Sequence, residues 1–320
     1  MTDVDIEDAL KFPVRGDDAL KIHAVAGGVP VLLNVVWTVV AIAGIVLPFL
    51  WLLYLPLVPL QLAVGILWLG YFLRVVRRTF AGATEPPALD DWGSLIRDGL
   101  WGTLVVLAYQ VPALVLSMVG YGVVFVAMFG AGGLAEGGAE GGAAAVGVVG
   151  ALLMLVVFGV VLLYSLAAGY LLPASLIAYA DEGHLGAAFS VERLKTVTYS
   201  QEYAIPWIVV AGVYGAVAGV VSFLASLLIG YLLVPFLPLF YFYLGTAAFY
   251  MLAQAYATRT GMAVPEVGPS AEGTAEGTAP GGAGGGTGTE DGAGTTQAGT
   301  EDGAGTAPTG AGRDRDPDDI

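Results

Sequence analysis

Residues 24–73 read AVAGGVPVLLNVVWTVVAIAGIVLPFLWLLYLPLVPLQLAVGILWLGYFL and contain no Asp, Glu, Lys or Arg. A straight helix through this run would measure about 75 Å, more than twice the ~30 Å thickness of a bilayer's hydrocarbon core. Pro48, Pro56 and Pro59 interrupt the run, and proline disrupts a helix interior. The run therefore predicts a helical hairpin that crosses a membrane twice, with its turn at 54–59.

Three further uncharged runs follow, at 99–135, 141–180 and 203–258. An uncharged, mainly apolar run of about 18 residues or more is a candidate transmembrane helix. The last run is long enough for two helices and divides near Gly230. The sequence thus predicts an all-α integral membrane protein with six transmembrane helices in three hairpins, with spans at about 28–53, 57–73, 101–129, 144–172, 205–229 and 232–255.

The composition also favours a membrane protein. Hydrophobic residues make up 57% of the chain and charged residues 12%, whereas soluble domains carry about 25% charged residues. There is no cysteine, which excludes disulfides, thiolate metal sites and cysteine nucleophiles. The first 23 residues are polar and net acidic, so we expect no cleavable signal peptide.

The Lys and Arg residues predict an orientation. Six spans place the N-terminal arm, the 74–99 loop, the 173–204 loop and the C-terminal tail on one side of the membrane. These segments hold 3, 4, 2 and 3 Lys or Arg residues, which is all 12 in the chain. Because Lys and Arg concentrate in cytoplasmic loops, we expect a cell-membrane protein with both termini in the cytoplasm.

The chain is predicted to divide into a membrane domain, 1–258, and an acidic tail rich in Gly, Thr and Ala, 259–320. From Val264 onward the tail has no aromatic residue, so it should be disordered. The segment after Tyr256 holds 11 acidic and 3 basic residues, −8 of the net charge of −15. This acid-rich, lysine-poor balance resembles that of proteins from salt-loving archaea; an acidic interaction tail is the alternative. No basic stripe occurs, which argues against nucleic acid binding.

Each predicted hairpin follows a charged segment whose apolar residues recur at helical spacing. Such segments suit amphipathic helices that lie at the cytoplasmic surface of the membrane, with Trp92 as an anchor. We therefore predict three copies of interfacial helix plus hairpin. The residues that set the spacing are Ala19, Ile22 and Ala26, then Leu89, Trp92, Ile96 and Leu100, then Ala187, Val191, Leu194 and Thr198.

One stretch, GYFLRVVRRTFAGATEPPALDDWGSLIRDGL (70–100), resembles the hallmark of the DUF4013 membrane proteins. In that family a helix that ends in a Gly-Tyr-Leu-Arg type of sequence leads through a proline-containing linker to an Asp-Trp-Gly element. LGAAFSVERLKTV (185–197) is similar to the family's second cytoplasmic element, and FPVRGDDALK (12–21) to its N-terminal arm. The resemblance covers roughly residues 5–258. The family is found largely in archaea and bacteria and its function is unknown, so the resemblance implies an architecture and no chemistry.

The most distinctive candidate site is a cluster formed by Arg74, Arg77, Arg78 and Trp92. Its arginines could hold an anionic lipid head group or another anionic ligand. The alternative is orientation alone, because arginines that end a helix anchor it on the cytoplasmic side. For the neighbouring Asp90 and Asp91, helix capping is favoured over a metal or acid–base pair.

We find no motif for catalysis or cofactor binding. The sequence has no GxSxG elbow, P-loop or glycine fingerprint, and His23 and His184 do not form a zinc motif. We expect both histidines to be solvated at the surface, and we expect no catalytic residue, metal or cofactor. The predicted spans contain no Asp, Glu, Lys, Arg or His, the groups that drive ion-coupled transport.

The fifth span carries small residues at four-residue spacing, which permits two helix backbones to approach closely. Packing within the chain is favoured over packing against another subunit. The residues of this predicted helix-packing face are Ala211, Gly215, Gly219, Ser222, Ser226 and Gly230.

These features favour a non-enzymatic membrane scaffold or accessory subunit, whose partners are the lipid bilayer and a membrane protein or a second copy of the chain. The alternative is a transporter or channel for a small neutral or hydrophobic solute. A transporter would use the helices that contain Pro112 and Pro206 and neutral side chains such as Gln110 and Gln254. A membrane-embedded enzyme is the weakest hypothesis, because no catalytic motif occurs.

Overall fold

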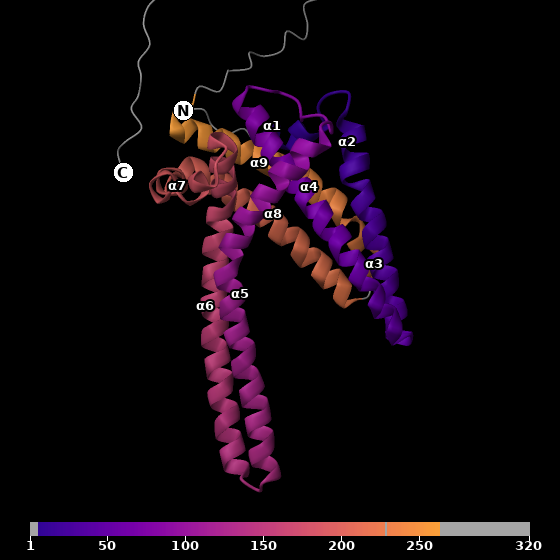
Figure 1. Ribbon diagram of the computed structural model, residues 1–320, viewed down its shortest axis with the longest axis vertical. Coiled ribbons are helices and arrows are strands. Elements are labelled where there is room, and N and C mark those ends of the chain that lie inside the picture. The colour runs from indigo at the N-terminus through magenta and orange to yellow at the C-terminus, as the bar shows by residue number, and fades with distance from the viewer. Residues whose placement is uncertain (1–5, 228, 263–320) are drawn as a thin grey trace, which may run out of the picture. The chain divides into compact units, whose positions relative to one another are not determined.

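The computed structural model describes residues 6–227 and 229–262, and within these ranges all regular elements are helical (Figure 1). The α-helices are α1 (Ile6–Lys11), α2 (Ala19–Ala26), α3 (Gly28–Val46), α4 (Tyr54–Phe80), α5 (Trp92–Glu136), α6 (Glu140–Glu182), α7 (Val191–Thr198), α8 (Gln201–Ser226) and α9 (Leu237–Thr260). The 3-10 helices are η1 (Phe12–Val14), η2 (Pro48–Leu53), η3 (Leu185–Phe189), η4 (Ile229–Leu232) and η5 (Val234–Phe236). The tail predicted to be disordered lies outside the described residues from 263 onward.

Six helical segments of the described chain are long and apolar enough to cross a membrane. They are Ala19–Val46, Pro48–Phe80, Trp92–Gly133, Gly141–Glu182, Gln201–Ser226 and Val234–Thr260. In all but the last, at most 17% of the most apolar window is buried inside the protein, against 61% in the last. So large an exposed apolar surface is unfavourable in water and is compatible with helices that lie in a membrane. The prediction of an all-α, membrane-compatible fold with six apolar helices is confirmed.

Helices α4 and α9 form the centre of the helical domain. Helix α9 packs against α4 and α8 and also contacts α1, α2 and α3. It buries side chains on several faces, including Phe242 and Tyr256, each with no exposed surface. Helix α4 also packs against α5, with Tyr71 and Leu73 buried.

Helices α4 and α5 approach each other closely at two glycines. A Cβ atom on Gly70 would lie 2.0 Å from the carbonyl oxygen of Leu95, and one on Gly99 would lie 2.0 Å from the carbonyl oxygen of Ile66. No side chain can occupy either position without moving a backbone. The two glycines therefore determine where the backbones of α4 and α5 come into close contact.

Helices α5 and α6 run side by side along their length (Figure 1). Gly120 faces Val157, and Gly150 faces Ala127, so small residues again mark the contact. Most of the remaining surface of the pair is exposed, as Leu155 (68%) and Phe158 (62%) illustrate. The pair thus presents a largely apolar outer surface.

Helix α6 passes through Pro173, where the predicted span ended, and continues to Glu182. Proline leaves the carbonyl of Gly169 without its helical N–H donor, and the indole Nε1–H of Trp207 donates to this carbonyl at 3.1 Å. One residue on, the hydroxyl of Tyr203 accepts from the N–H of Ala174 at 3.1 Å and donates to the carbonyl of Tyr170 at 3.0 Å. Two side chains of α8 thus supply the hydrogen bonds that the proline disrupts.

The turn of the first hairpin differs from the prediction. Helix α3 ends at Val46 and Pro48 begins η2, so the turn lies at 47–53 and not at 54–59. Pro56 lies in the first turn of α4, where a missing N–H costs nothing. Pro59 is accommodated one turn later, inside the same helix.

The amphipathic segments also need a correction. Before the second hairpin there is no separate helix, because Trp92 opens α5 and the helix continues without a break to Glu136. Short separate helices do precede α3 and α8, namely α2 and α7. The predicted apolar spacing does not mark the face of α5 that packs on α4. Trp92, Ile96 and Leu100 are 46%, 45% and 49% exposed, whereas Leu95 is buried against α4.

Candidate functional site

The segments that carry the described Lys and Arg residues meet at one end of the helices, which we call the charged end. The last turn of α4 contacts the last turn of α6 and the second turn of α5, and the last turn of α9 contacts the first turn of α8. The N-terminal segment of α1 and η1 packs on α9 at the same end (Figure 1). Of the predicted candidate residues, the four in the arginine cluster lie here.

Arg74 is a structural residue that holds the linker after α4. Its guanidinium donates to the carbonyl oxygen of Asp90 at 2.8 Å and to a carboxylate oxygen of the same residue at 2.7 Å. It also donates to the hydroxyl of Ser94 at 2.8 Å and to the carbonyl of Ala88 at 3.2 Å. Only 15% of its side chain is exposed, so Arg74 has little capacity left for an outside anion.

Arg77 is likewise committed to contacts within the protein. One of its terminal nitrogens pairs with the buried carboxylate of Asp98 in α5, and its Nε–H donates to the carbonyl of Ala180 in α6 at 3.3 Å. The residue therefore joins three helices at the charged end. A buried carboxylate needs such a cation, because desolvation of an unpaired charge is costly.

Arg78 and Trp92 differ from these two arginines, because both are exposed. Trp92 is 46% exposed at the start of α5. The structure therefore does not join the four predicted residues into one open cation site. Two hold the protein together, and Arg78 and Trp92 remain on the surface.

Asp91 caps the start of α5, as the sequence predicted. Its carboxylate accepts from the N–H of Ser94 at 3.3 Å. Hydrogen bonding by the side chain and then by the backbone of Ser94 holds the pKa of Asp91 below its usual value. The backbone φ of Asp91 is +45°, a left-handed conformation that aspartate tolerates better than most residues. Throughout residues 6–227 and 229–262, no three His, Asp or Glu side chains come together as a set of metal ligands.

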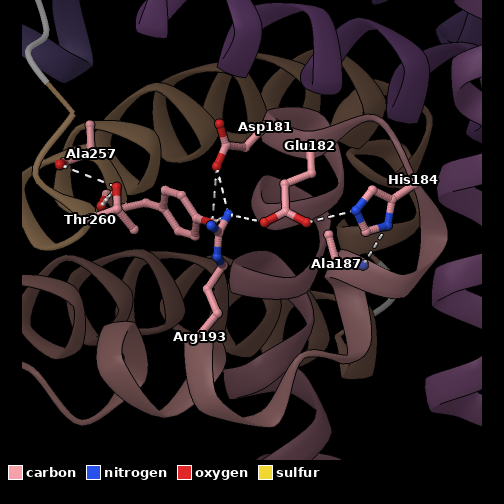
Figure 2. Close-up of polar contacts among 8 residues, drawn as sticks. Asp181, Glu182, His184, Ala187, Arg193, Ala257 and Thr260 are labelled. Atoms are coloured by element: carbon pink, nitrogen blue, oxygen red, sulfur yellow. Dashed lines mark hydrogen bonds and ion pairs between the residues drawn. The ribbon is translucent and has the colours of Figure 1, made fainter. Parts of the chain in front are cut away.

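A second charged cluster links α6, α7 and α9 (Figure 2). Arg193 of α7 contacts Asp181 at 2.8 Å and Glu182 at 2.5 Å, both in the last turn of α6. Arg193 also donates to the hydroxyl of Tyr256 in α9 at 3.1 Å. Glu182 in turn contacts His184 Nε2 at 2.9 Å. Sequence analysis missed this cluster, although a lone arginine on the polar face of a short helix was an available signal.

The matched region of a protein-family model contains both charged clusters except for Tyr256. The model is described as "Protein of unknown function (DUF4013)" and matches residues 49–230, more than half of the chain. The chain belongs to the DUF4013 family. The resemblance noted at 70–100 and 185–197 is thereby confirmed, since both stretches lie inside the match. No curated protein and no solved structure matches the chain.

The N-terminal arm of this DUF4013 protein lies before the matched range and docks on α9. Phe12 is fully buried and stacks on Tyr250 with ring centroids 3.9 Å apart. Tyr250 donates to the carboxylate of Asp8 at 3.1 Å, and Arg15 pairs with the same carboxylate. The hydrogen bond from Arg15 is the largest influence on Asp8 and lowers the pKa of its carboxyl group.

The two histidines occupy different environments in the DUF4013 fold. His184 has 65% of its side chain exposed, as expected of a surface residue. His23 was also expected to be solvated, but it packs on Phe242 with ring centroids 5.6 Å apart. Its Nδ1 contacts the carbonyl of Ala19 at 2.8 Å, and its Nε2 is buried. The prediction for His23 was wrong because contacts with α9 cannot be read from local spacing.

The predicted helix-packing face on α8 is not covered by other parts of the described chain at its glycines. Gly215 and Gly219 have nothing within 4 Å of the position that a Cβ would take. The expectation that this face packs within the chain is therefore wrong at these two positions. Gly230 lies beyond the end of α8 in η4, where a Cβ would lie 2.1 Å from the backbone nitrogen of Ala225. It serves the turn after α8 and not the helix face.

Proposed function

We propose that this DUF4013 protein is a non-enzymatic membrane scaffold or accessory subunit that binds another membrane helix through α8. The observation that carries the proposal is the open space above Gly215 and Gly219. Both glycines are exposed within a helix apolar enough to cross a membrane. Small residues on a transmembrane helix allow a second helix to approach closely, which favours association.

The surrounding residues support the same role. Ser222 and Ser226 are exposed on α8 beyond the two glycines, and Ala211 is partly exposed before them. The partner is a transmembrane helix of a second copy or of another membrane protein. The ion pairs of the charged end hold the protein's own helices together, as expected of a rigid scaffold.

We further propose that the charged end lies in the cytoplasm, with both termini on that side. The support is the collection of every described Lys and Arg residue at this end, together with the preference of these residues for cytoplasmic loops. In this arrangement α2 and α7 lie at the cytoplasmic surface of the membrane. The repeated unit of interfacial helix plus hairpin remains part of the proposal for the first and third hairpins, and not for the second.

The scaffold proposal is tested by self-association and partner recovery. Full-length protein labelled with donor or acceptor dyes is reconstituted into vesicles at low density, and energy transfer is measured. Gly215→Ile should reduce energy transfer at least severalfold, because the added side chain blocks close helix approach. Gly65→Ile is the matched control, since Gly65 is also exposed with open space around it but lies on α4.

If the partner is another protein, wild-type protein purified in mild detergent should retain it, and Gly215→Ile should lose it. Unchanged energy transfer in Gly215→Ile, together with no stoichiometric protein in the purified sample, would reject the proposal.

A transporter for a small neutral or hydrophobic solute is the competing proposal. Gln110, one of its predicted polar residues, is exposed on the outer side of α5. Flux of neutral solutes into vesicles that is abolished by Gln110→Ala or Gln254→Ala would favour transport over the scaffold role. We expect no such flux.

A further inference from the structure

Two of the apolar helices in the described chain are much longer than the others. Helices α5 and α6 have 45 and 43 residues, which is about 68 and 65 Å at a rise of about 1.5 Å per residue. Their uncharged parts, 99–135 and 141–180, measure about 55 and 60 Å. The uncharged parts of α3, α4, α8 and α9 measure about 29–36 Å, close to the ~30 Å hydrocarbon core of a typical bilayer.

Arg77 shows where the uncharged part of the α5–α6 pair begins. It pairs with Asp98 of α5 and donates to the carbonyl of Ala180 in α6, so these two residues lie at the same level. Phe129 lies about 46 Å along α5 from Asp98, and Val148 lies about 48 Å along α6 from Ala180. Phe129 and Val148 are 65% and 60% exposed. Exposed apolar side chains thus continue beyond the thickness of an ordinary hydrocarbon core.

The apolar surface surrounds the pair and does not follow one side of it. On α5, the partly covered positions from 113 to 127 recur at helical spacing, and two of them, Gly120 and Ala127, face α6. All other positions from 111 to 130 are exposed. The half of the pair nearest its turn lies apart from the other helices (Figure 1). A partner protein would cover one side of the pair, whereas a surface that is apolar all round fits the interior of a membrane.

Tilt alone does not fit the pair into an ordinary bilayer. Transmembrane helices tilt by up to about 40° from the membrane normal. At that tilt an apolar length of about 55 Å still extends about 42 Å along the normal, which exceeds the hydrocarbon core by about 12 Å. A bilayer can remove such a mismatch by becoming thicker around the helix.

We propose that the α5–α6 hairpin gathers lipids with long hydrocarbon chains, so that the bilayer around it is thicker than the bilayer around α3, α4, α8 and α9. The ligand is the hydrocarbon chain and not the head group, because 99–135 and 141–180 contain no charged residue. The protein therefore favours thick regions of a membrane. This role is independent of the packing face on α8, which belongs to another hairpin.

A dye near the end of the hairpin tests the match with bilayer thickness. Bimane is attached to Met128→Cys, an exposed position about 45 Å from Asp98, in a chain without other cysteines. Full-length protein is reconstituted into dimyristoleoyl-, dioleoyl- or dierucoylphosphatidylcholine, whose chains lengthen in that order. The emission should shift to shorter wavelength as the chains lengthen, because the dye passes from water into hydrocarbon. Val39→Cys, exposed on α3, is the matched control and should emit alike in all three bilayers.

Competition between lipids measures the selection directly. Mixed bilayers contain equal amounts of the dimyristoleoyl and dierucoyl lipids, and one of the two carries bromine, which quenches the dye on contact. Brominated dierucoyl lipid should quench the dye on Met128→Cys about twofold more than brominated dimyristoleoyl lipid, because the longer chain removes the mismatch. The two lipids should quench the dye on Val39→Cys equally.

A shortened hairpin tests whether length is the cause. Deletion of 121–127 and 150–156 removes two turns at facing positions of the two helices and keeps their contact in register. The dye on Met128→Cys should then lose both its dependence on chain length and its preference for the dierucoyl lipid. The measurements on the intact hairpin do not require this variant to fold.

Three results would overturn the proposal. Emission at long wavelength in all three bilayers would show that the end of the hairpin lies in water. Emission at short wavelength in all three, with no quenching by either brominated lipid, would show that a protein covers it. Equal quenching of the dye on Met128→Cys by the two lipids would show that the hairpin does not select chain length. None of these results bears on energy transfer in Gly215→Ile, so failure here is distinct from failure of the scaffold proposal.

Discussion

Tyr203 of α8 stabilises a helix to which it does not belong. Its hydroxyl accepts from the N–H of Ala174 and donates to the carbonyl of Tyr170, next to Pro173 in α6. In a regular α-helix these two backbone groups would bond directly to each other. Tyr203 is fully buried, so water cannot replace these hydrogen bonds. A proline in a long transmembrane helix is tolerated where a neighbouring helix satisfies the freed backbone groups.

Tyr203→Phe should therefore destabilise the protein by about 1–3 kcal/mol, the cost of leaving buried polar groups unpaired. Chemical unfolding in detergent, followed by circular dichroism, measures the change. Tyr214→Phe is the control, because it removes one hydrogen bond to a carbonyl inside α9 and should cost less. Pro173→Ala should recover part of the loss in the Tyr203→Phe background. Additive effects of the two substitutions would contradict the account.

The docked N-terminal arm should respond to acid. The pKa of Asp8 is lowered in the folded protein, chiefly by the hydrogen bond from Arg15. A lowered folded-state pKa contributes stability above the unfolded value of about 3.9, and this contribution is lost as the pH falls through the folded value. A nitroxide label on Val14→Cys, an exposed position in a chain without cysteine, should thus become more mobile below about pH 4.

Asp8→Asn supplies the comparison for the acid experiment. Its label should already be more mobile at pH 7 and should change less on acidification, because the titrating group is absent. A label whose mobility depends on pH equally in both proteins would place the titration elsewhere.

At the scale of helices, glycine decides where α4 and α5 meet. Gly70→Ala or Gly99→Ala would place a Cβ atom 2.0 Å from a carbonyl oxygen, which forces the two backbones apart. Overpacking of this kind costs about 1–3 kcal/mol or more. Thermal unfolding of either variant should show the loss, whereas Gly65→Ala on the same helix has open space and should be neutral or slightly stabilising.

Uncharged runs were enough to predict six apolar helices, because in a bilayer the length and polarity of a segment determine whether it spans. Turn positions were predicted less well. Pro56 and Pro59 suggested a turn, yet α4 begins before them, since proline fits the first turn of a helix. Likewise, Trp92–Leu100 has amphipathic spacing whether the helix ends there or continues, and spacing alone cannot distinguish these cases.

The candidate residues show the same limit for long-range contacts. The sequence predicted that Arg74 and Arg77 end a helix, and Arg77 lies in the last turn of α4. The partners of these arginines, Ser94, Asp98 and Ala180, lie 20 to 103 residues away. Nothing local marks an arginine that is already paired. For the same reason, spacing predicted a packing face at Gly215, but only the structure shows that no part of the described chain lies close to this glycine.

At the scale of the whole molecule, the charge distribution predicts a topology that is directly testable. The turn between α5 and α6, at 137–139, lies at the end of these helices opposite the charged end (Figure 1). The linker between α4 and α5, at 81–91, lies at the charged end. If that end is cytoplasmic, as the preference of Lys and Arg predicts, the two loops lie on opposite sides of the membrane.

Single cysteines at exposed positions in the two loops, Ala139→Cys and Ala81→Cys, can report this arrangement, because the chain has no cysteine of its own. In intact cells a membrane-impermeant maleimide should label Ala139→Cys and leave Ala81→Cys unlabelled until the membrane is opened. Labelling of both in intact cells would show that α5 does not span the bilayer. The reverse pattern would retain the six spans but invert the protein, and the positive residues of the charged end would then need an external anionic partner to explain their position.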